Sequence, residues 1–388
     1  MGCLPSSMAP LQLEEQEIEY PSPNIDSIVE QTNKFFAAEN LKVRRSRTMS
    51  LGGYHAIIEL IVDINAETCK GEDSASQRQL VARVDFPFQA LCTDKAIAVP
   101  WKLASEVATM QYVKERTAIP IPRIYFYDED ADGKVGGAWM LMEYVNGDDL
   151  QYHWQTMSRA QKQSICCSIA DYWNQLLSLR FDAIGSLHFD DSGEIKVGPL
   201  SMMCSLSTTA YDYPSRDKCG PFATTREWIM AEANGDFRYK TRIYMARGSK
   251  AEGEDRQENR RLFIRDTVSW LSELPLLHEP DTYPTTLCPS DFGMHNVMVS
   301  RRDPTEIVAV IDWEGTQTVP IWNIHRPSFF GVAECEEQVE LDAMLWEKVG
   351  SLNATWSESM ASGRYLRNAA MRASLSDWDP ASYTLEMS

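Results

Sequence analysis

The first part of the chain alternates between apolar runs typical of strands and stretches with apolar residues at helical spacing. Residues 25–36 have this helical spacing, and Asn24 is placed to cap their first turn. A second helix is expected to begin at Pro100 and to end near Lys114, before the sequence Ile-Pro-Ile-Pro. The expected strands are 54–64 and 80–86, which pair as a long hairpin, followed by 125–127 and 138–144.

The second part of the chain is mainly helical in pattern, with a long helix expected over 158–179. The polar stretch 248–259 is expected to be an exposed loop. Residues 1–23 are rich in Pro, Ser and Glu, which is typical of a disordered tail. The pattern therefore predicts a small, strand-rich segment over 24–147 and a larger, mainly helical segment over 148–388, with a ligand site between them.

Two apolar runs, 297–299 and 307–311, flank an Asp-Pro turn and predict an antiparallel hairpin. The first residue of one hairpin strand lies opposite the last residue of the other. We therefore expect Asn296 and Asp312 side by side at the open end, with Asp291 just outside. Amide and carboxylate oxygens suit a hard cation such as Mg²⁺. Asp and Asn also cap strands and turns, so these residues alone leave a structural role equally open.

Two charged residues lie where the pattern is apolar. Glu106 falls on the face of the predicted helix that carries Leu103 and Val107, and a carboxylate there is costly unless it is paired. Arg83 is a basic residue within the apolar strand 80–86. Together they predict a buried Arg83–Glu106 ion pair, although Arg83 taken alone is better explained by the exposed face of its strand.

The order of these features resembles the aminoglycoside phosphotransferase and choline kinase family of the protein-kinase-like fold, particularly its fungal members. That family has a glycine-bearing hairpin, a strand with a basic residue, a helix with a glutamate, a hinge, an Asp-x₄-Asn loop and a metal-binding Asp in an I-D-W-E-like string. The resemblance covers roughly residues 25–335. It implies an α+β, two-lobed protein-kinase-like fold, with a small antiparallel-sheet N-lobe and a larger, mainly helical C-lobe. The matching positions are Gly52, Gly53, Arg83, Glu106, Met142, Glu143, Val145, Asp291, Asn296 and Asp312.

The resemblance implies a small-molecule kinase that uses ATP and Mg²⁺ and transfers the γ-phosphate to an alcohol group. Asp291 would act as the catalytic base, and Asn296 and Asp312 would hold Mg²⁺. Arg83 would contact the nucleotide phosphates and be steadied by Glu106. The other implied nucleotide-binding positions are Gly52 and Gly53 in the hairpin, Met142 behind the adenine, and the backbone of Glu143 and Val145.

Two positions depart from the family pattern. Pro289 stands where the family usually has a histidine that supports the catalytic loop by hydrogen bonding, which proline cannot do. Arg83 stands where lysine is common, although arginine there resembles the fungal members. The alternative function is therefore a catalytically weak or inactive nucleotide-binding pseudokinase or scaffold. His295 is a candidate substitute for the missing histidine, although a structural role is commoner for a single histidine.

A formal net charge of -19 disfavours binding to nucleic acid. It favours a small-molecule acceptor, possible charges of which include a positive one. Solubility alone explains the net charge of the chain as well. The acidic residues Glu334, Glu336 and Glu337 could attract an amine-bearing acceptor or simply form a solvated helix face. The sequence gives no indication of the oligomeric state.

The nine cysteines include no C-x-x-C pair, so neither a zinc site nor a secreted disulfide framework is expected. No apolar run approaches the roughly 18–20 residues of a membrane span. These observations predict a cytoplasmic protein. The N-terminal sequence also fits an acylation pattern at Gly2 and Cys3, although the acidic stretch around Glu14 is unlike the basic patch that assists an acyl anchor.

Overall fold

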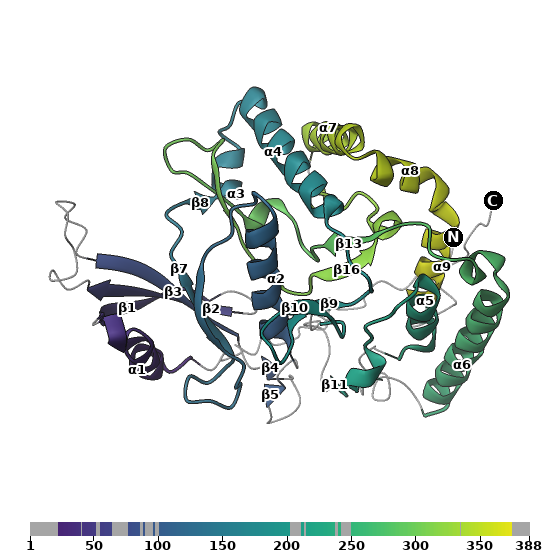
Figure 1. Ribbon diagram of the computed structural model, residues 1–388, viewed down its shortest axis with the longest axis horizontal. Helices are drawn as coiled ribbons and strands as arrows, with labels where there is room; N and C mark the ends of the chain where they lie inside the picture. The colour runs from purple at the N-terminus through teal and green to yellow at the C-terminus, as the bar shows by residue number, and fades with distance from the viewer. Residues whose placement is uncertain are drawn as a thin grey trace, which may run out of the picture.

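The computed structural model describes residues 22–39, 41–51, 55–63, 77–85, 88–89, 96–97, 101–201, 211–212, 215–236, 240–241, 250–333 and 335–374. They form an α+β fold of two lobes, a small one around an antiparallel sheet and a larger, mainly helical one (Figure 1). This arrangement confirms the two-lobed, protein-kinase-like fold. The tail predicted over residues 1–23 lies outside the described residues except for its last two positions.

The N-lobe sheet has the strand order β1-β2-β3-β7-β6, and all of its neighbouring strands are antiparallel. Its strands are β1 (Lys42–Leu51), β2 (His55–Asp63), β3 (Gln77–Asp85), β6 (Ile124–Asp128) and β7 (Trp139–Glu143). The pairing of β2 with β3 confirms the predicted hairpin, and it runs in register from His55, opposite Asp85, to Asp63. Alternate residues of β2, such as Ile58 and Leu60, are buried on one face, as the period of a strand requires.

Helix α1 (Ile25–Phe35) covers that face of the sheet. Asn24 caps the helix as predicted, because its side-chain oxygen accepts a hydrogen bond from the Ser27 backbone N–H at 3.1 Å. Ile28 and Phe36 then join the buried cluster of β2 and β3. The short helix η1 (Ala37–Glu39) and the strands β4 (Phe88–Gln89) and β5 (Ala96–Ile97) complete the elements around the sheet.

Helix α2 (Lys102–Arg116) lies between the sheet and the helical lobe (Figure 1). It ends at Arg116, before the two prolines that follow in the sequence. Val107 and Val113 belong to the main core, which also contains Ile165 of the C-lobe, so the largest hydrophobic cluster crosses from one lobe to the other.

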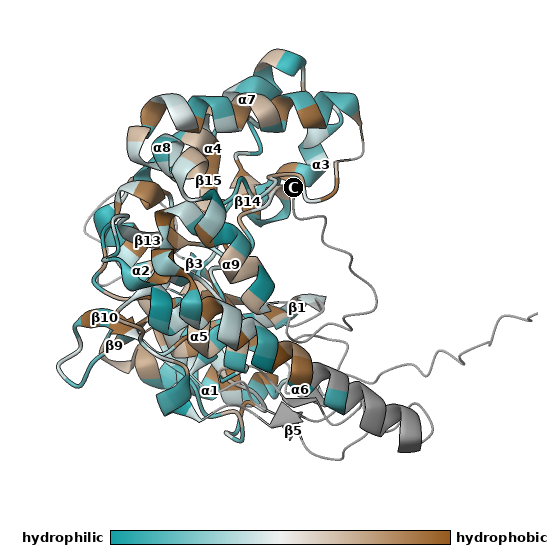
Figure 2. Cartoon of the chain, turned by 90° about the vertical axis from the view of Figure 1, so that its right-hand side faces the viewer, coloured by the Kyte–Doolittle hydropathy of each residue, from teal (hydrophilic) through white to brown (hydrophobic). Residues whose placement is uncertain are grey.

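The C-lobe helices are α3 (Leu150–Trp154), α4 (Arg159–Ser178), α5 (Thr225–Asn234), α6 (Lys250–Glu273), α7 (Glu336–Leu352), α8 (Ala354–Ser362) and α9 (Arg364–Ser374). Helix α4 is the long helix that the sequence predicted, and Ser158 and Gln161 form a capping box at its start. Hydrophobic and hydrophilic residues mix along α7 and α9 in Figure 2, as expected of helices with one buried and one exposed face.

Short strands and 3₁₀ turns connect these helices. The strands are β8 (Asp148–Asp149), β9 (Ser186–Phe189), β10 (Ile195–Gly198), β11 (Tyr211–Asp212), β12 (Lys240–Thr241), β13 (Thr285–Cys288), β14 (Val297–Val299), β15 (Ile307–Val310) and β16 (Gln317–Pro320). The 3₁₀ turns are η2 (Arg216–Lys218), η4 (Pro275–His278), η5 (Met294–Asn296) and η6 (Ile321–Asn323). Strand β8, at the start of the C-lobe, pairs with β14 of the predicted hairpin, which gives the three-stranded sheet β15-β14-β8.

The expected loop over 248–259 is wrong, because α6 begins at Lys250 and includes nearly all of it. This stretch is polar on every side, so it has no apolar period that would indicate a helix. It is nevertheless rich in Glu, Lys, Arg and Gln, which favour helix. The later turns of α6 bury Leu271, and Trp270 lies 4.6 Å from the guanidinium of Arg372 on α9.

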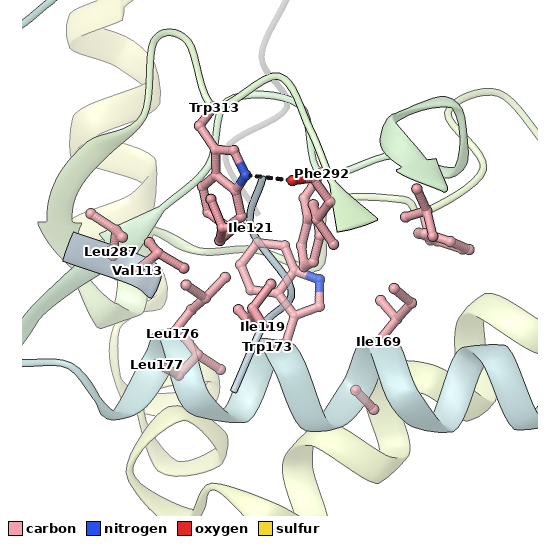
Figure 3. Packing of buried hydrophobic residues seen from close by; sticks show 14 of the residues in the cluster. Val113, Ile119, Ile121, Ile169, Trp173, Leu176, Leu177, Leu287, Phe292 and Trp313 are labelled. Atoms are coloured by element: carbon pink, nitrogen blue, oxygen red, sulfur yellow. Dashed lines mark hydrogen bonds between the residues drawn. The ribbon is translucent and has the colours of Figure 1, made fainter. Parts of the chain in front are cut away.

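The core holds the segment after β13 through aromatic contacts (Figure 3). The ring of Phe292 lies 5.4 Å from Trp173 of α4 and 6.0 Å from Trp313, centroid to centroid. The Trp313 indole N–H donates to the Val310 carbonyl at 3.1 Å. Each fully buried apolar side chain of this size contributes about 1.5–3 kcal/mol. The buried side chains of Phe292 and Trp313 therefore anchor the loops on either side of the hairpin in the core.

Across the described part of the chain, none of the helices is long and apolar enough to span a membrane.

Candidate active site

The C-lobe hairpin brings Asn296 and Asp312 together as predicted. Val297 pairs with Val310, and the backbone N–H of Ile311 donates to the Asn296 carbonyl at 2.9 Å. Asp312 follows with a φ of +62°, in the left-handed region that non-glycine residues seldom adopt. Such backbone strain is found most often at functional sites, where the surrounding structure maintains it.

Asp291 lies just outside the hairpin, also as predicted, and its carboxylate is half-exposed. The Asn296 side-chain N–H donates to the Asp291 carbonyl at 2.9 Å, and Nε2 of His295 lies 2.8 Å from the Asp291 carboxylate. Gly293 allows this turn, since a Cβ there would lie 2.7 Å from the His295 ring. The loop is therefore supported by Asn296 and His295, although residue 289 is proline.

Arg83 and Glu106 form the predicted ion pair, with Nη1 of Arg83 on the Glu106 carboxylate. Both side chains are buried. The other terminal nitrogen of Arg83, Nη2, lies 3.5 Å from Asp312 and 3.3 Å from Glu314, both in the C-lobe. Burial alone would lower the pKa of Arg83, but the carboxylates of Glu106, Asp312 and Glu314 raise it above the ordinary arginine value. The guanidinium therefore stays charged.

Four further residues complete this charged cluster: His55, Asp85, Lys102 and Glu314. Nζ of Lys102 lies 2.6 Å from Glu314 and 3.1 Å from Asp85. Nε2 of His55 lies 3.2 Å from Asp85 and 3.3 Å from Glu314. Burial favours a raised pKa for the Glu314 carboxyl, yet the hydrogen bond from His55 and the charges of Lys102 and Arg83 hold it at about 2.

The sequence analysis assigned none of these four residues to the site, although local spacing contained a signal for Lys102 and Asp85. Lys102 and Glu106 are four positions apart on α2 and therefore share a helix face. Arg83 and Asp85 are two positions apart on β3 and share a strand face. Because Arg83 and Glu106 were already expected to be buried, their neighbours on the same faces were candidates for the same cluster.

A cavity of about 450 Å³ opens beside the cluster. Apolar side chains line it from both lobes, with Ile57 and Val81 from the sheet and Met298 and Ile311 from the hairpin. Six of the predicted site residues line it: Arg83, Met142, Glu143, Val145, Asn296 and Asp312. Glu106 stands behind Arg83, and Asp291 lies on the neighbouring loop rather than in the cavity wall. Gly52 and Gly53 lie outside the described residues.

Asp312 and Asn296 fit a cation site. One carboxylate oxygen of Asp312, Oδ1, is buried without a hydrogen-bond partner. The amide N–H of Asn296 is used on Asp291, which leaves its oxygen as the atom available to a cation. Among the described residues no three His, Cys, Asp or Glu side chains are grouped so as to hold a metal. Mg²⁺ commonly uses only one or two protein ligands together with water and phosphates, so this pair is sufficient.

The chain resembles fungal proteins over part of their length. A subtelomeric hrmA-associated cluster protein of Aspergillus fumigatus is 24% identical over 290 residues, covering 63% of this chain and 54% of that protein. Mitochondrial altered inheritance of mitochondria protein 9 of Meyerozyma guilliermondii is 31% identical over 118 residues, covering 30% of this chain and 19% of that protein. The chain thus matches about half of the first relative and about a fifth of the second.

Solved aminoglycoside phosphotransferases align over most of the chain. The ternary complex of APH(2″)-IIa with streptomycin and ATP covers 87% of each chain at 13% identity, with a TM-score of 0.44. ADP-bound APH(2″)-Ib covers 89% of this chain and 90% of its own at 14% identity, also with a TM-score of 0.44.

The family model described as the phosphotransferase enzyme family matches residues 85–322, more than half of the chain. The match begins at Asp85 of the charged cluster and extends past Glu314. It therefore contains helix α2, the Asp291 loop and the Asn296–Asp312 hairpin. The chain belongs to the phosphotransferase enzyme family.

Proposed function

We propose that the protein is a kinase that transfers the γ-phosphate of ATP, bound with Mg²⁺, to a hydroxyl of a small molecule. The observation that carries the proposal is the convergence of Arg83, Asn296 and Asp312 on one cavity of about 450 Å³. That volume is within the range of small-molecule sites. On this proposal the nucleotide lies between an N-lobe of residues 24–147 and a C-lobe of residues 148–388.

The nucleotide would be bound at both ends of the cavity. Arg83, held by Glu106, would contact the phosphates. At the other end, the backbone of Glu143 and Val145 would bond the adenine edge, with Met142 behind it. Met142 pairs with Val81 in the sheet, which supports its place in the apolar wall. The assignment of Gly52 and Gly53 to the phosphates rests on the sequence resemblance.

Asn296 and Asp312 would hold Mg²⁺ through their side-chain oxygens. The ion would supply positive charge to the phosphate oxygens on which negative charge develops. Oδ1 of Asp312 supports this role, because it is buried without a hydrogen bond and its ion-pair contact with Arg83 is long at 3.5 Å, which leaves it able to bind a cation.

Asp291 would orient the acceptor hydroxyl and accept its proton. Its carboxylate is half-exposed, so an acceptor can reach it from outside the nucleotide cavity. Phosphoryl transfer depends mainly on positioning and charge neutralisation, and a single well-placed carboxylate fits that demand. The hydrogen bonds from His295 and Asn296 would fix the loop that presents it.

A nucleotide-binding pseudokinase is the second candidate, and Pro289 favours it. Proline offers no side-chain hydrogen bond to the catalytic loop. The contact of His295 with Asp291 favours the active enzyme, because it gives the carboxylate a hydrogen-bond partner that the residue at 289 does not.

We propose that the acceptor is a small molecule with a hydroxyl. Glu337 of the predicted acidic cluster lies 2.7 Å from Lys162, which favours a helix-to-helix ion pair over an open amine site. Glu334 lies outside the described residues. Cytoplasmic location and acylation of Gly2 and Cys3 stay predictions, and the relative from Meyerozyma guilliermondii is a mitochondrial protein.

Two measurements test the proposed function. Thermal unfolding should shift upward with ATP and Mg²⁺, and ligand at 100 times its Kd should add about 2.7 kcal/mol. A screen of amines and sugars for phosphate transfer should then find an acceptor. The absence of any shift at millimolar ATP–Mg²⁺ would exclude nucleotide binding. Binding without transfer to any acceptor would favour the pseudokinase.

A further inference from the structure

Glu314 connects elements that the proposed mechanism requires to stay in register. Its side chain is only 3% exposed, and one oxygen, Oε2, meets cationic or hydrogen-bonding groups from three N-lobe elements. These are Lys102 of α2 at 2.6 Å, Arg83 of β3 at 3.3 Å and His55 of β2 at 3.3 Å. One C-lobe carboxylate, on the loop after the hairpin, therefore contacts both the N-lobe sheet and helix α2.

The backbone of Glu314 makes a second connection, within the C-lobe. Its carbonyl accepts a hydrogen bond from the hydroxyl of Ser290, the residue before Asp291. Glu314 also lies two residues after Asp312. It thus contacts the candidate base loop through its backbone and the phosphate-binding arginine through its side chain.

The guanidinium of Arg83 is held by carboxylates from both lobes. Nη1 is bound by Glu106 in the N-lobe, whereas Nη2 faces Glu314 and Asp312 in the C-lobe. Carboxylates on both terminal nitrogens fix the plane of a guanidinium, since its donors form a rigid fork. Nη2 also lies 2.7 Å from Nε2 of His55, which itself lies 3.3 Å from Glu314, so Glu314 contacts both the guanidinium and the N-lobe side chain beside it.

We propose that Glu314 is a positioning residue for phosphate binding. Its contact with Lys102 connects the two lobes, and its contact with Arg83 orients the guanidinium toward the cavity that Asp312 also lines. The proposal rests on the proposed function. Glu314 acts through Arg83 and is not among the residues that line the cavity. Its loss should therefore weaken binding of the phosphates and leave the apolar base site intact.

The test compares two ligands on the full chain, ATP–Mg²⁺ and adenosine, by calorimetry. Glu314→Gln keeps the size of the side chain and removes its charge. It should raise the Kd for ATP–Mg²⁺ about 10- to 100-fold, in the range of coupling between neighbouring charged residues. The Kd for adenosine, which has no phosphates, should change less than about twofold.

Glu59→Gln is the matched control. Like Glu314, Glu59 is a buried carboxylate, only 4% exposed, and it lies on β2. It pairs with Arg47 and Gln79 and does not line the cavity. This variant should bind both ligands like the wild type. Lys102→Met is a second test variant, for use if Glu314→Gln does not fold. It removes the contact of Glu314 with α2, and we expect it to show the same selective loss of ATP–Mg²⁺ binding.

Each outcome separates the inference from the function on which it rests. A selective loss of ATP–Mg²⁺ binding in Glu314→Gln or Lys102→Met supports the inference. An equal loss of both ligands, or the same selective loss in Glu59→Gln, overturns it and leaves the kinase proposal standing. A wild-type protein that binds neither ligand overturns the proposed function, and the inference fails with it.

Discussion

The Arg83 guanidinium lies 3.5 Å from the Asp312 carboxylate, and this contact crosses from the sheet of one lobe to the loop of the other. Both residues line the same cavity. Asp312 reaches this place with a positive φ, directly before Trp313, whose side chain is buried in the aromatic core. The positive φ of Asp312 therefore lies where the two lobes contact each other, and backbone strain of this kind clusters at functional sites.

The Arg83–Glu106 pair should behave as one unit. Arg83→Ala leaves the buried Glu106 carboxylate without its cation and should lower the free energy of unfolding by about 3–5 kcal/mol. Glu106→Gln should cost less, because Arg83 keeps its contacts with Asp312 and Glu314. The double variant should lose clearly less stability than the sum of the two single losses, because the second substitution removes a charge whose partner is already absent. Urea denaturation of the four proteins measures this coupling. Additive losses would show that the two side chains do not interact.

His55 should make stability depend on pH above 6.5. Burial and Arg83 lower its pKa, but the hydrogen bonds to Asp85 and Glu314 outweigh them and raise it above 6.5, with Lys102 the other charge facing the ring. A raised pKa in the folded state stabilises the protein below pH 6.5, and this contribution is lost as the pH rises through the folded pKa.

The measurement is the free energy of unfolding in urea at a series of pH values above 6.5. Wild type should lose stability by at most about 1.4 kcal/mol per pH unit through this single group, and His55→Gln should lose that part of the slope. His278→Gln, a substitution of an exposed histidine on η4, is the control and should keep the wild-type slope. Equal slopes for wild type and His55→Gln would contradict the prediction.

Phe292 should stabilise the loop that carries Asp291. Phe292→Ala leaves a cavity between Trp173 and Trp313, and we expect a loss of about 3–5 kcal/mol. Phe292→Leu keeps most of the volume and should cost less. Urea unfolding followed by tryptophan fluorescence checks both variants. A cost for Phe292→Ala below about 1 kcal/mol would mean that the aromatic contacts do not hold the loop.

The sequence could predict those parts of the site that depend on local pattern. The hairpin that joins Asn296 to Asp312 follows from two apolar runs and one turn, and the pairing of strands dictates the rest. The Arg83–Glu106 contact could also be predicted, because each residue interrupts an apolar face. By contrast, the contacts of Glu314 depend on how one lobe lies on the other. No local period encodes that arrangement, so they became visible only in the folded chain.

Helix α6 was missed for a related reason. Its first turns have no apolar face, and the pattern that locates most helices is therefore absent. Propensity was the remaining signal, and it is weak beside a buried face. His295 could be named as a substitute for the missing histidine, but its contact with Asp291 depends on the tight approach that Gly293 permits.

The last prediction separates the two carboxylates that the proposed mechanism uses. Asp291→Asn should lower turnover by about 10²–10⁴-fold, the usual contribution of a general base, and leave the affinity for ATP–Mg²⁺ nearly unchanged. Asp291 is outside the cavity wall, so its loss should not reach the triphosphate. Asp312→Asn should impair both, because Asp312 is the proposed metal ligand and also contacts Arg83.

Calorimetry with ATP–Mg²⁺ and turnover on a verified acceptor measure these effects in the same two variants. Ser300→Ala, in the loop just after β14 and outside the cavity wall, is the control and should match the wild type in both assays. Full activity of Asp291→Asn would show that the base is another residue. Equal loss of nucleotide affinity in both variants would mean that Asp291 faces the phosphates rather than the acceptor. Either result would require a different assignment of the loop that Asn296 and His295 hold in place.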